Sequence, residues 1–145
     1  MNCEQRTLVP VWYWVIPVMA LLWNMMGCAA FLMEVFAQEA MMESMSEAQK
    51  DWARAIPSWI YFVYALAVTT GVAGSIGLFM QKAWSVPLFA FCVVAVIVQM
   101  GYTILIAGGL QVMGPSGLVM PVLVIVFASA LLWFSWFAKG KSWLV

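Results

Sequence analysis

The chain has 145 residues, of which 66% are apolar and only 8% are charged, with a net charge of zero and no histidine. This composition excludes a water-soluble domain with a charged surface, and the six scattered basic residues offer no footprint for nucleic acid. The three cysteines form no C-x-x-C pair, and the apolar stretches hold no cluster of metal ligands. The sequence therefore predicts neither an enzyme nor a protein with a metal or cofactor.

Four apolar stretches fill most of the chain, and each reaches the roughly 20 residues needed to cross about 30 Å of hydrocarbon. They cover residues 11–36, 57–80, 86–107 and 118–138. The first could be a signal peptide because Arg6 precedes it, but Asn24 interrupts the run and the apolar residues continue past Cys28. We therefore expect an all-α, single-domain protein, a transmembrane four-helix bundle in the lipid bilayer.

The segment 38–56, after the first stretch, is typical of an amphipathic helix at the membrane surface. Its carboxylates recur every four residues, and with Glu34 they define a predicted outer acidic face of Glu34, Glu39, Glu43 and Glu47. This face is either solvated, or a cation-attracting vestibule, or a docking surface for a partner. Glu34 is either solvated at the interface or a proton-coupling carboxylate.

Small residues recur in the second stretch at the spacing that lets two helices approach closely. They are Gly71, Gly74, Ser75 and Gly77. The partner helix belongs either to the same chain or to another copy. The uncharged, glycine-rich segment 108–117 between the third and fourth stretches is predicted to cap the bundle as a tight turn, or to form a re-entrant lip.

Polar side chains occur near the middle of all four stretches, when depth is counted at about 1.5 Å per residue. The predicted midplane layer contains Asn24, Thr69, Thr70, Gln99 and Ser129. An unpaired amide is costly in hydrocarbon, so Asn24 and Gln99 should point into the bundle. They are either hydrogen-bonded links between helices or part of a small polar pocket with Trp23 and Tyr102 as walls.

The distribution of basic residues sets the expected orientation in the membrane. Four basic residues lie on the side of the N-terminus and two on the other, which favours cytoplasmic termini.

Several short strings resemble a family of small four-span bacterial inner-membrane proteins that are often labelled "sugar transporter". They are ALLWNMMG at 20–27, AWSVP at 83–87, VQM at 98–100, GPSG at 114–117 and AKGKSW at 138–143. The resemblance implies a bacterial inner-membrane location. Two functions follow as hypotheses: facilitated passage of a small neutral polar solute, by a homo-oligomer, or a non-catalytic accessory or assembly subunit of a larger membrane complex.

Overall fold

The computed structural model describes residues 8–145, which form helices and no strand. Within this part of the chain, four helical segments are long and apolar enough to cross a membrane: Val11–Phe36, Ser58–Phe79, Ser85–Ile106 and Pro115–Gly140. They agree with the four predicted stretches to within a few residues. The prediction of an all-α, four-span fold with an extra outer amphipathic element is confirmed.

The spans are built from four long helices with short irregular turns at three of their ends. The 3-10 turn η1 (Val11–Trp14) leads into α1 (Val15–Phe36), and α4 (Ser58–Phe79) follows without one. The π-helical turn η2 (Tyr102–Ile106) continues α5 (Ser85–Gly101). The short helix α6 (Gly109–Met113) and the 3-10 turn η3 (Pro115–Leu118) then lead into α7 (Val119–Gly140).

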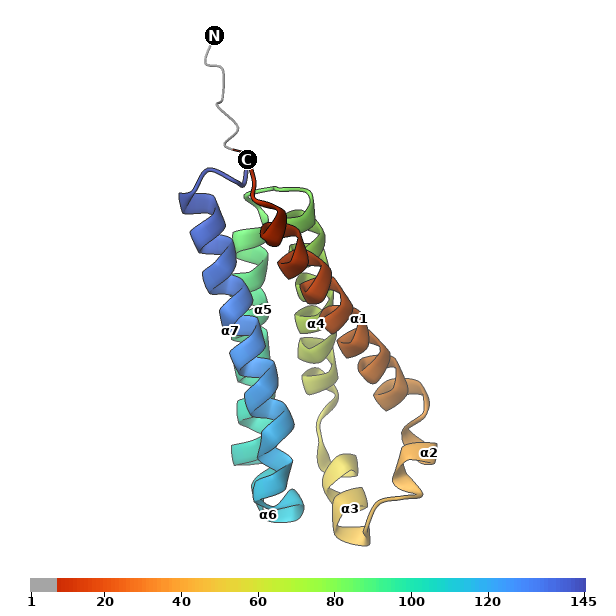
Figure 1. Cartoon of the computed structure of the whole chain (residues 1–145). Helices are drawn as coiled ribbons and strands as arrows, with labels where there is room; N and C mark the ends of the chain where they lie inside the picture. Colours follow the sequence, from red (N-terminus) through yellow and green to blue (C-terminus); the bar gives the residue numbers. More distant parts are fainter. Residues whose placement is uncertain (1–7) are drawn as a thin grey trace.

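The long helices pack in a row, with α1 against α4, α4 against α5, and α5 against α7. The start of η1 and the C-terminus lie at one end of the bundle, and α2, α3 and α6 lie at the other, which we call the outer end (Figure 1). Figure 1 also shows that α1 diverges from α7 toward the outer end. The bundle is therefore widest where α2 and α3 lie.

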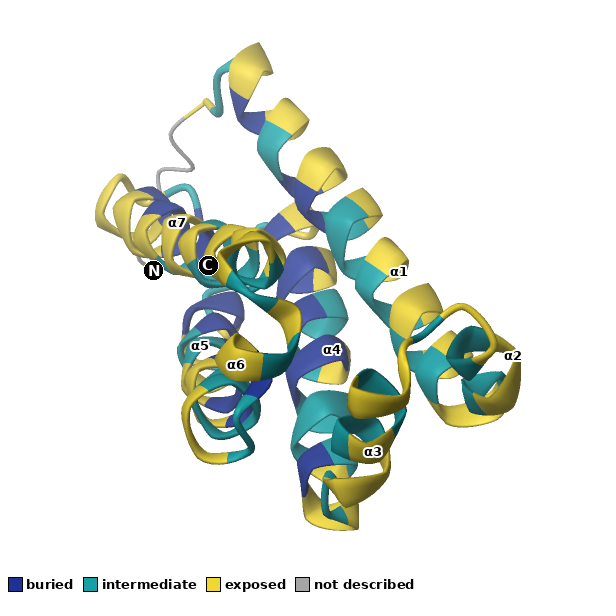
Figure 2. Ribbon diagram, turned by 90° about the horizontal axis from the view of Figure 1, so that it is seen from below, coloured by how far each residue is buried: buried dark blue, intermediate teal, exposed yellow. Residues whose placement is uncertain are grey.

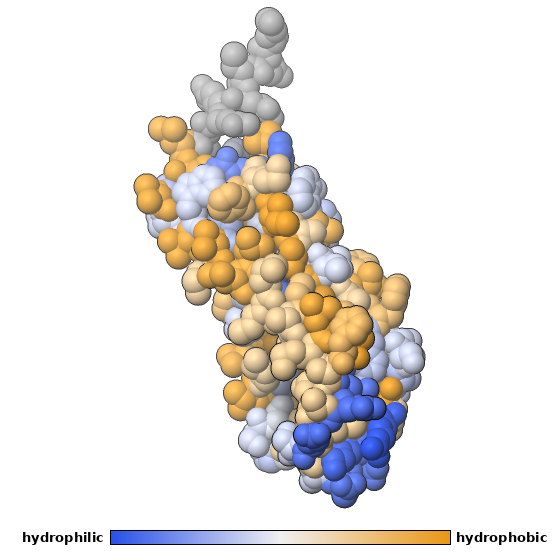
Figure 3. All heavy atoms as spheres, turned by 90° about the vertical axis from the view of Figure 1, so that its right-hand side faces the viewer, coloured by the Kyte–Doolittle hydropathy of each residue, from blue (hydrophilic) through white to orange (hydrophobic). Residues whose placement is uncertain are grey.

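The surface has the pattern expected of a protein in lipid. Figure 2 shows exposed positions along the outward sides of the long helices. Large apolar side chains such as Leu22, Phe62 and Trp136 are exposed. Hydrophilic residues gather at the outer end (Figure 3). Since hydrocarbon solvates apolar side chains, such a surface is stable in a bilayer and aggregation-prone in water.

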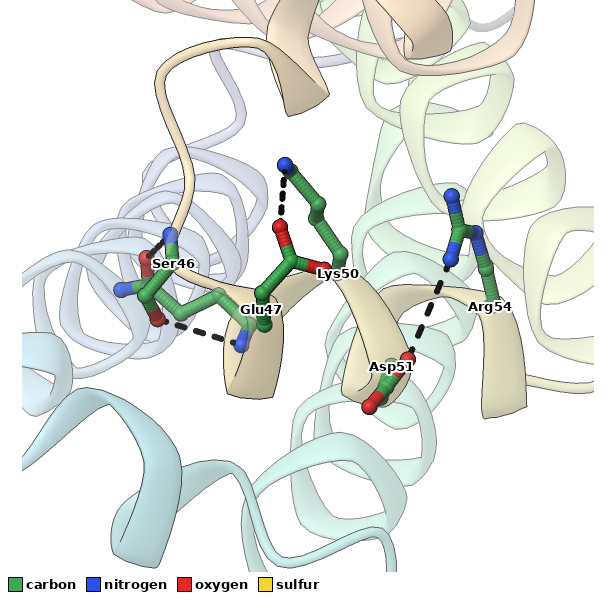
Figure 4. A network of polar contacts seen from close by, with 6 residues as sticks. Ser46, Glu47, Lys50, Asp51 and Arg54 are labelled. Atoms are coloured by element: carbon green, nitrogen blue, oxygen red, sulfur yellow. Dashed lines mark hydrogen bonds and ion pairs between the residues drawn. The ribbon is translucent and has the colours of Figure 1, made fainter.

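The predicted single helix over 38–56 is wrong in one respect, because it is broken into α2 (Gln38–Met42) and α3 (Glu47–Ala55). Ser46 has extended backbone, and its hydroxyl accepts a hydrogen bond from the Gln49 amide at 3.3 Å. The Gln49 side chain in turn accepts from the Ser46 amide at 3.0 Å, which completes a capping box (Figure 4). This cap starts a new helix at Glu47.

Two ion pairs lie on the exposed side of α3, at the three-residue spacing expected for a helix (Figure 4). Lys50 lies 2.8 Å from Glu47, and Arg54 lies 3.9 Å from Asp51. The hydrogen bond from Lys50 and its positive charge lower the pKa of the Glu47 carboxyl. Such exposed pairs contribute little stability, so the cap matters more than the charges.

Helix α4 lies at the centre of the fold because its small residues admit close neighbours on both sides. A Cβ on Gly71 would collide with the Asn24 side chain of α1. A Cβ on Gly74 would lie 3.1 Å from the Phe89 ring of α5. The structure thus places these buried small residues against helices of the same chain.

Rings fill the bundle at the end that carries the termini. The Tyr13 hydroxyl donates a hydrogen bond to the Leu78 carbonyl at 2.6 Å, and the side chain is fully buried. Its ring contacts those of Phe134 and Trp143, with centroids 5.7 Å away in each case. These rings join η1 to α7 and close this end of the bundle.

Candidate functional site

A cavity of about 240 Å³, the inner cavity, lies between the four long helices. Every span contributes to its lining, for example Asn24 from α1, Tyr64 from α4, Gln99 from α5 and Val124 from α7. Most of the lining is apolar or aromatic. Such a cavity can hold a small molecule whose apolar surface leaves contact with water or lipid.

Asn24 lines the inner cavity and also links two helices. Its side-chain amide donates hydrogen bonds to the Ala20 carbonyl at 2.8 Å and to the Ser75 hydroxyl of α4 at 3.1 Å. Ser75, which is fully buried, donates onward to the Gly71 carbonyl at 2.8 Å. Both amide protons of Asn24 are therefore in use, so this residue joins α1 to α4.

Gln99 differs from Asn24 because its amide is left without a partner. The residue is 7% exposed, and no residue within 8–145 forms a hydrogen bond with its side chain. It lines the inner cavity on one side and a second cavity on the other. Within the described residues, the fully buried side-chain N or O atoms without a partner are those of Trp52 and Ser85, so the Gln99 amide keeps some accessible surface. This amide is thus free to bind a molecule that enters either cavity.

The second cavity, the outer cavity, has a volume of about 350 Å³ and lies under α2, α3 and α6. Its polar lining includes Glu34, Gln38, Trp52 and Thr103. Gln99, Met100 and Met120 line both cavities and therefore form the boundary between them. The two cavities therefore adjoin at these three residues, and both are lined mainly by apolar side chains.

Aromatic rings bound the inner cavity toward the opposite end. The rings of Trp23 and Phe127 stack across the gap between α1 and α7, with centroids 4.5 Å apart. The cavity ends against Phe89 and Leu131, which belong to the same packed cluster as Tyr13. The inner cavity is therefore closed on the side of the termini.

Of the five residues in the predicted midplane layer, Asn24 and Gln99 line the inner cavity, whereas Thr69, Thr70 and Ser129 line neither cavity. Thr69 is exposed, and its hydroxyl donates to the Ala65 carbonyl at 2.7 Å. Thr70 is half-buried and donates to the Leu66 carbonyl at 2.6 Å. Ser129 is exposed on α7 and lines neither cavity. A hydroxyl that bonds to its own helix needs no partner from another helix, so polarity at this depth does not dictate an inward side chain.

The predicted pocket walls and acidic face also change. Trp23 lines the inner cavity, but Tyr102 lines neither cavity and packs its ring against Trp59 at 4.9 Å. Glu34 lines the outer cavity, whereas Glu39, Glu43 and Glu47 are exposed. The carboxylates form no single face, because the helix ends at Phe36 and is broken again before Glu47.

Two features of the site are not evident from helical periodicity. Ser75 was expected only as a packing residue, yet its hydroxyl accepts the hydrogen bond from Asn24. The outer cavity is also rich in methionine, and its members come from segments far apart in the sequence. The abundance of methionine was visible beforehand, but the convergence depends on the tertiary fold.

No protein-family model matches the chain, and no curated protein or solved structure matches it. The fold itself defines a class, because its four apolar helices have the length and hydropathy of membrane spans. The chain has the architecture of a multi-pass integral membrane protein with an interior cavity.

Proposed function

We propose that the protein binds a small uncharged solute in the inner cavity and passes it to and from the outer end of the bundle. The unpartnered amide of Gln99 carries this proposal, because this largely buried residue lines both cavities and its amide keeps some accessible surface. A bound solute with one donor or acceptor would supply the hydrogen bond that the chain does not. Gln99 is therefore a binding residue at the boundary between the cavities.

The lining also indicates which neutral solutes fit. The polar side chains of the inner cavity are few, and the amide protons of Asn24 are already used. A sugar would have to bury many hydroxyls, each of which costs free energy when it loses water without gaining a partner. A compact apolar molecule with one or two hydrogen-bonding groups matches this cavity better than a free sugar. Among small neutral solutes, we therefore expect one of low polarity.

A role as an accessory subunit that docks through the glycine face of α4 is less favoured. Gly71 and Gly74 are buried against side chains of α1 or α5, and Gly77 is buried against Trp84, the residue before α5. A partner helix could reach them only if the bundle came apart. All four spans of one copy contribute to the lining of the inner cavity, so a solute site can form within a single copy.

The proposed setting is the inner membrane of a bacterium with both termini in the cytoplasm. The excess of basic residues on the side of the termini supports this orientation. The cavities then open toward the side away from the cytoplasm, and the packed aromatic rings lie on the cytoplasmic side.

The proposal can be tested by solute-dependent stabilisation of the purified chain. Neutral probes of graded polarity, from glucose through 1,2-hexanediol to phenol, are added during thermal unfolding in detergent. A solute at a hundred times its Kd stabilises the folded state by about 2.7 kcal/mol. We expect the less polar probes to stabilise the wild-type chain, and expect this effect to be lost in Gln99→Leu.

The matched control is Thr69→Val, which removes a polar group of similar depth from the exposed side of α4. It should retain the stabilisation. The best probe is then tested for flux into proteoliposomes. Absence of stabilisation by every probe, together with flux equal to that of empty vesicles, would refute the proposal.

A further inference from the structure

Methionine side chains converge on the outer cavity. Six of the twelve methionines in the chain line it: Met41, Met42, Met45, Met100, Met113 and Met120. They come from α2, the turn before α3, α5, α6 and α7. Leucine and isoleucine together are more numerous in the chain, yet they contribute only Ile56, Ile104, Leu110 and Leu118 to this lining.

The property that distinguishes methionine from leucine is its thioether sulfur. If the cavity needed only apolar volume, leucine and isoleucine would fill it equally well. A thioether is a soft, uncharged ligand, and soft sulfur ligands select Cu(I) among the biological metal ions. Within residues 8–145 no group of three or more His, Cys, Asp or Glu side chains could hold a metal ion. A metal bound in the outer cavity would therefore be held mainly by methionine.

One carboxylate accompanies these sulfurs. Glu34 lines the same cavity, and the ion pairs in the described part of the chain lie elsewhere, on α3. A monovalent cation beside a single carboxylate leaves no net charge in the cavity, which reduces the cost of holding it away from water. The cavity also lies at the outer end of the bundle, where an ion can reach it.

Two methionines, Met45 in the turn before α3 and Met113 in α6, can act as ligands without disturbing the inner cavity. Met45 and Met113 line the outer cavity alone, whereas Met100 and Met120 border both cavities. The sulfur of Met113 lies 3.4 Å from the position that a Cβ on Gly117 would occupy. The absence of a side chain at Gly117 therefore gives the Met113 side chain room to lie across this turn.

We propose that the outer cavity is a binding site for Cu(I), with methionine sulfurs as ligands and Glu34 as the balancing charge. The proposal goes beyond solute binding at Gln99 and does not depend on it. It involves coordination only, with no change in the oxidation state of the metal. The opposing explanation is that methionine provides an adaptable apolar lining for an organic molecule.

The two explanations differ in their response to Met→Leu substitution, which keeps apolar volume and removes sulfur. The full chain in detergent is titrated with Ag(I), a redox-inert probe for Cu(I), by calorimetry. The cavity variant is Met45→Leu with Met113→Leu. The control is Met25→Leu with Met33→Leu, two residues that are 54% and 55% exposed and line neither cavity.

All three proteins keep Cys3, Cys28 and Cys92, so Ag(I) bound by thiols contributes equally to each. We expect the wild-type chain and the control to bind Ag(I) alike, and the cavity variant to lose one bound ion or about tenfold in affinity. Equal stoichiometry and affinity in all three proteins would overturn the proposal.

A second measurement does not require any variant to fold. Ag(I) added to wild-type chain labelled with [13C]methyl methionine should shift the methyl signals of the cavity methionines and leave those of Met25 and Met33 in place. Uniform shifts, or none, would contradict the site. Solute stabilisation through Gln99 should persist in the cavity variant, so failure of one proposal is distinguishable from failure of the other.

Discussion

The hydrogen bond between Asn24 and Ser75 links α1 to α4, and a double-mutant cycle can measure its contribution. Asn24→Leu removes the donor and keeps a side chain of similar shape against Gly71. Ser75→Ala removes the acceptor, while Asn24 keeps its 2.8 Å bond to the Ala20 carbonyl. Ser75 in the first variant still donates to Gly71. Ser75→Ala leaves one N–H of the half-buried Asn24 amide without its partner, and the cycle separates this cost of the single variant from the coupling between the two residues.

The expected coupling follows from the medium. Interhelical hydrogen bonds in membrane proteins contribute on average about 0.6 kcal/mol and at most about 1.7 kcal/mol. The 3.1 Å bond is of ordinary length and one of its partners is fully buried. We therefore expect a coupling of about 0.6 to 1.7 kcal/mol between the two substitutions.

The assay is reversible unfolding of the wild-type chain, both single variants and the double variant in mixed detergent. The free energies of unfolding give the coupling by difference. A coupling indistinguishable from zero would mean that Asn24 does not join the two helices. The assignment of Asn24 to packing and of Gln99 to binding would then lose its basis.

Three further changes test other parts of the fold. Gly77→Ala places a Cβ 2.8 Å from the Trp84 ring and should lower the free energy of unfolding by about 1 to 3 kcal/mol. A Cβ on Gly140 would meet nothing within 4 Å, so Gly140→Ala should have no such effect in the same unfolding assay. Ser46→Ala removes the cap of α3 and should weaken that helix by about 0.5 to 2 kcal/mol, which faster hydrogen exchange of its amides would show and unchanged exchange would refute. Tyr13→Phe removes the 2.6 Å hydrogen bond to a main-chain carbonyl of α4 and should lower the unfolding free energy by about 0.5 to 1.5 kcal/mol; an unchanged value would show that ring packing alone holds this end.

The spans could be predicted from the sequence because length and hydropathy are properties of single segments. The break before Glu47 could also have been predicted, since Ser46 and Gln49 have the spacing of a capping box. The acidic repeat every four residues favoured a continuous helix instead. A local cap prevailed over that periodicity.

The direction of each polar side chain could not be predicted from depth alone. Asn24 turns inward because its amide finds both Ala20 and Ser75 there. Thr69 turns outward because its own helix satisfies its hydroxyl. The methionine lining is less predictable still, because Met45 and Met113 come together only after α3 and α6 pack against each other.

The most direct test of solute access is the reactivity of a cysteine at position 99. In a chain whose native cysteines are replaced, Gln99→Cys is exposed to a membrane-impermeant thiol reagent added from the side of α2 and α3. Ala95→Cys, one turn away, buried and outside both cavities, is the comparison. The account predicts that Cys at 99 reacts much faster and that a bound neutral solute protects it, whereas equal, slow reaction at both positions would contradict it.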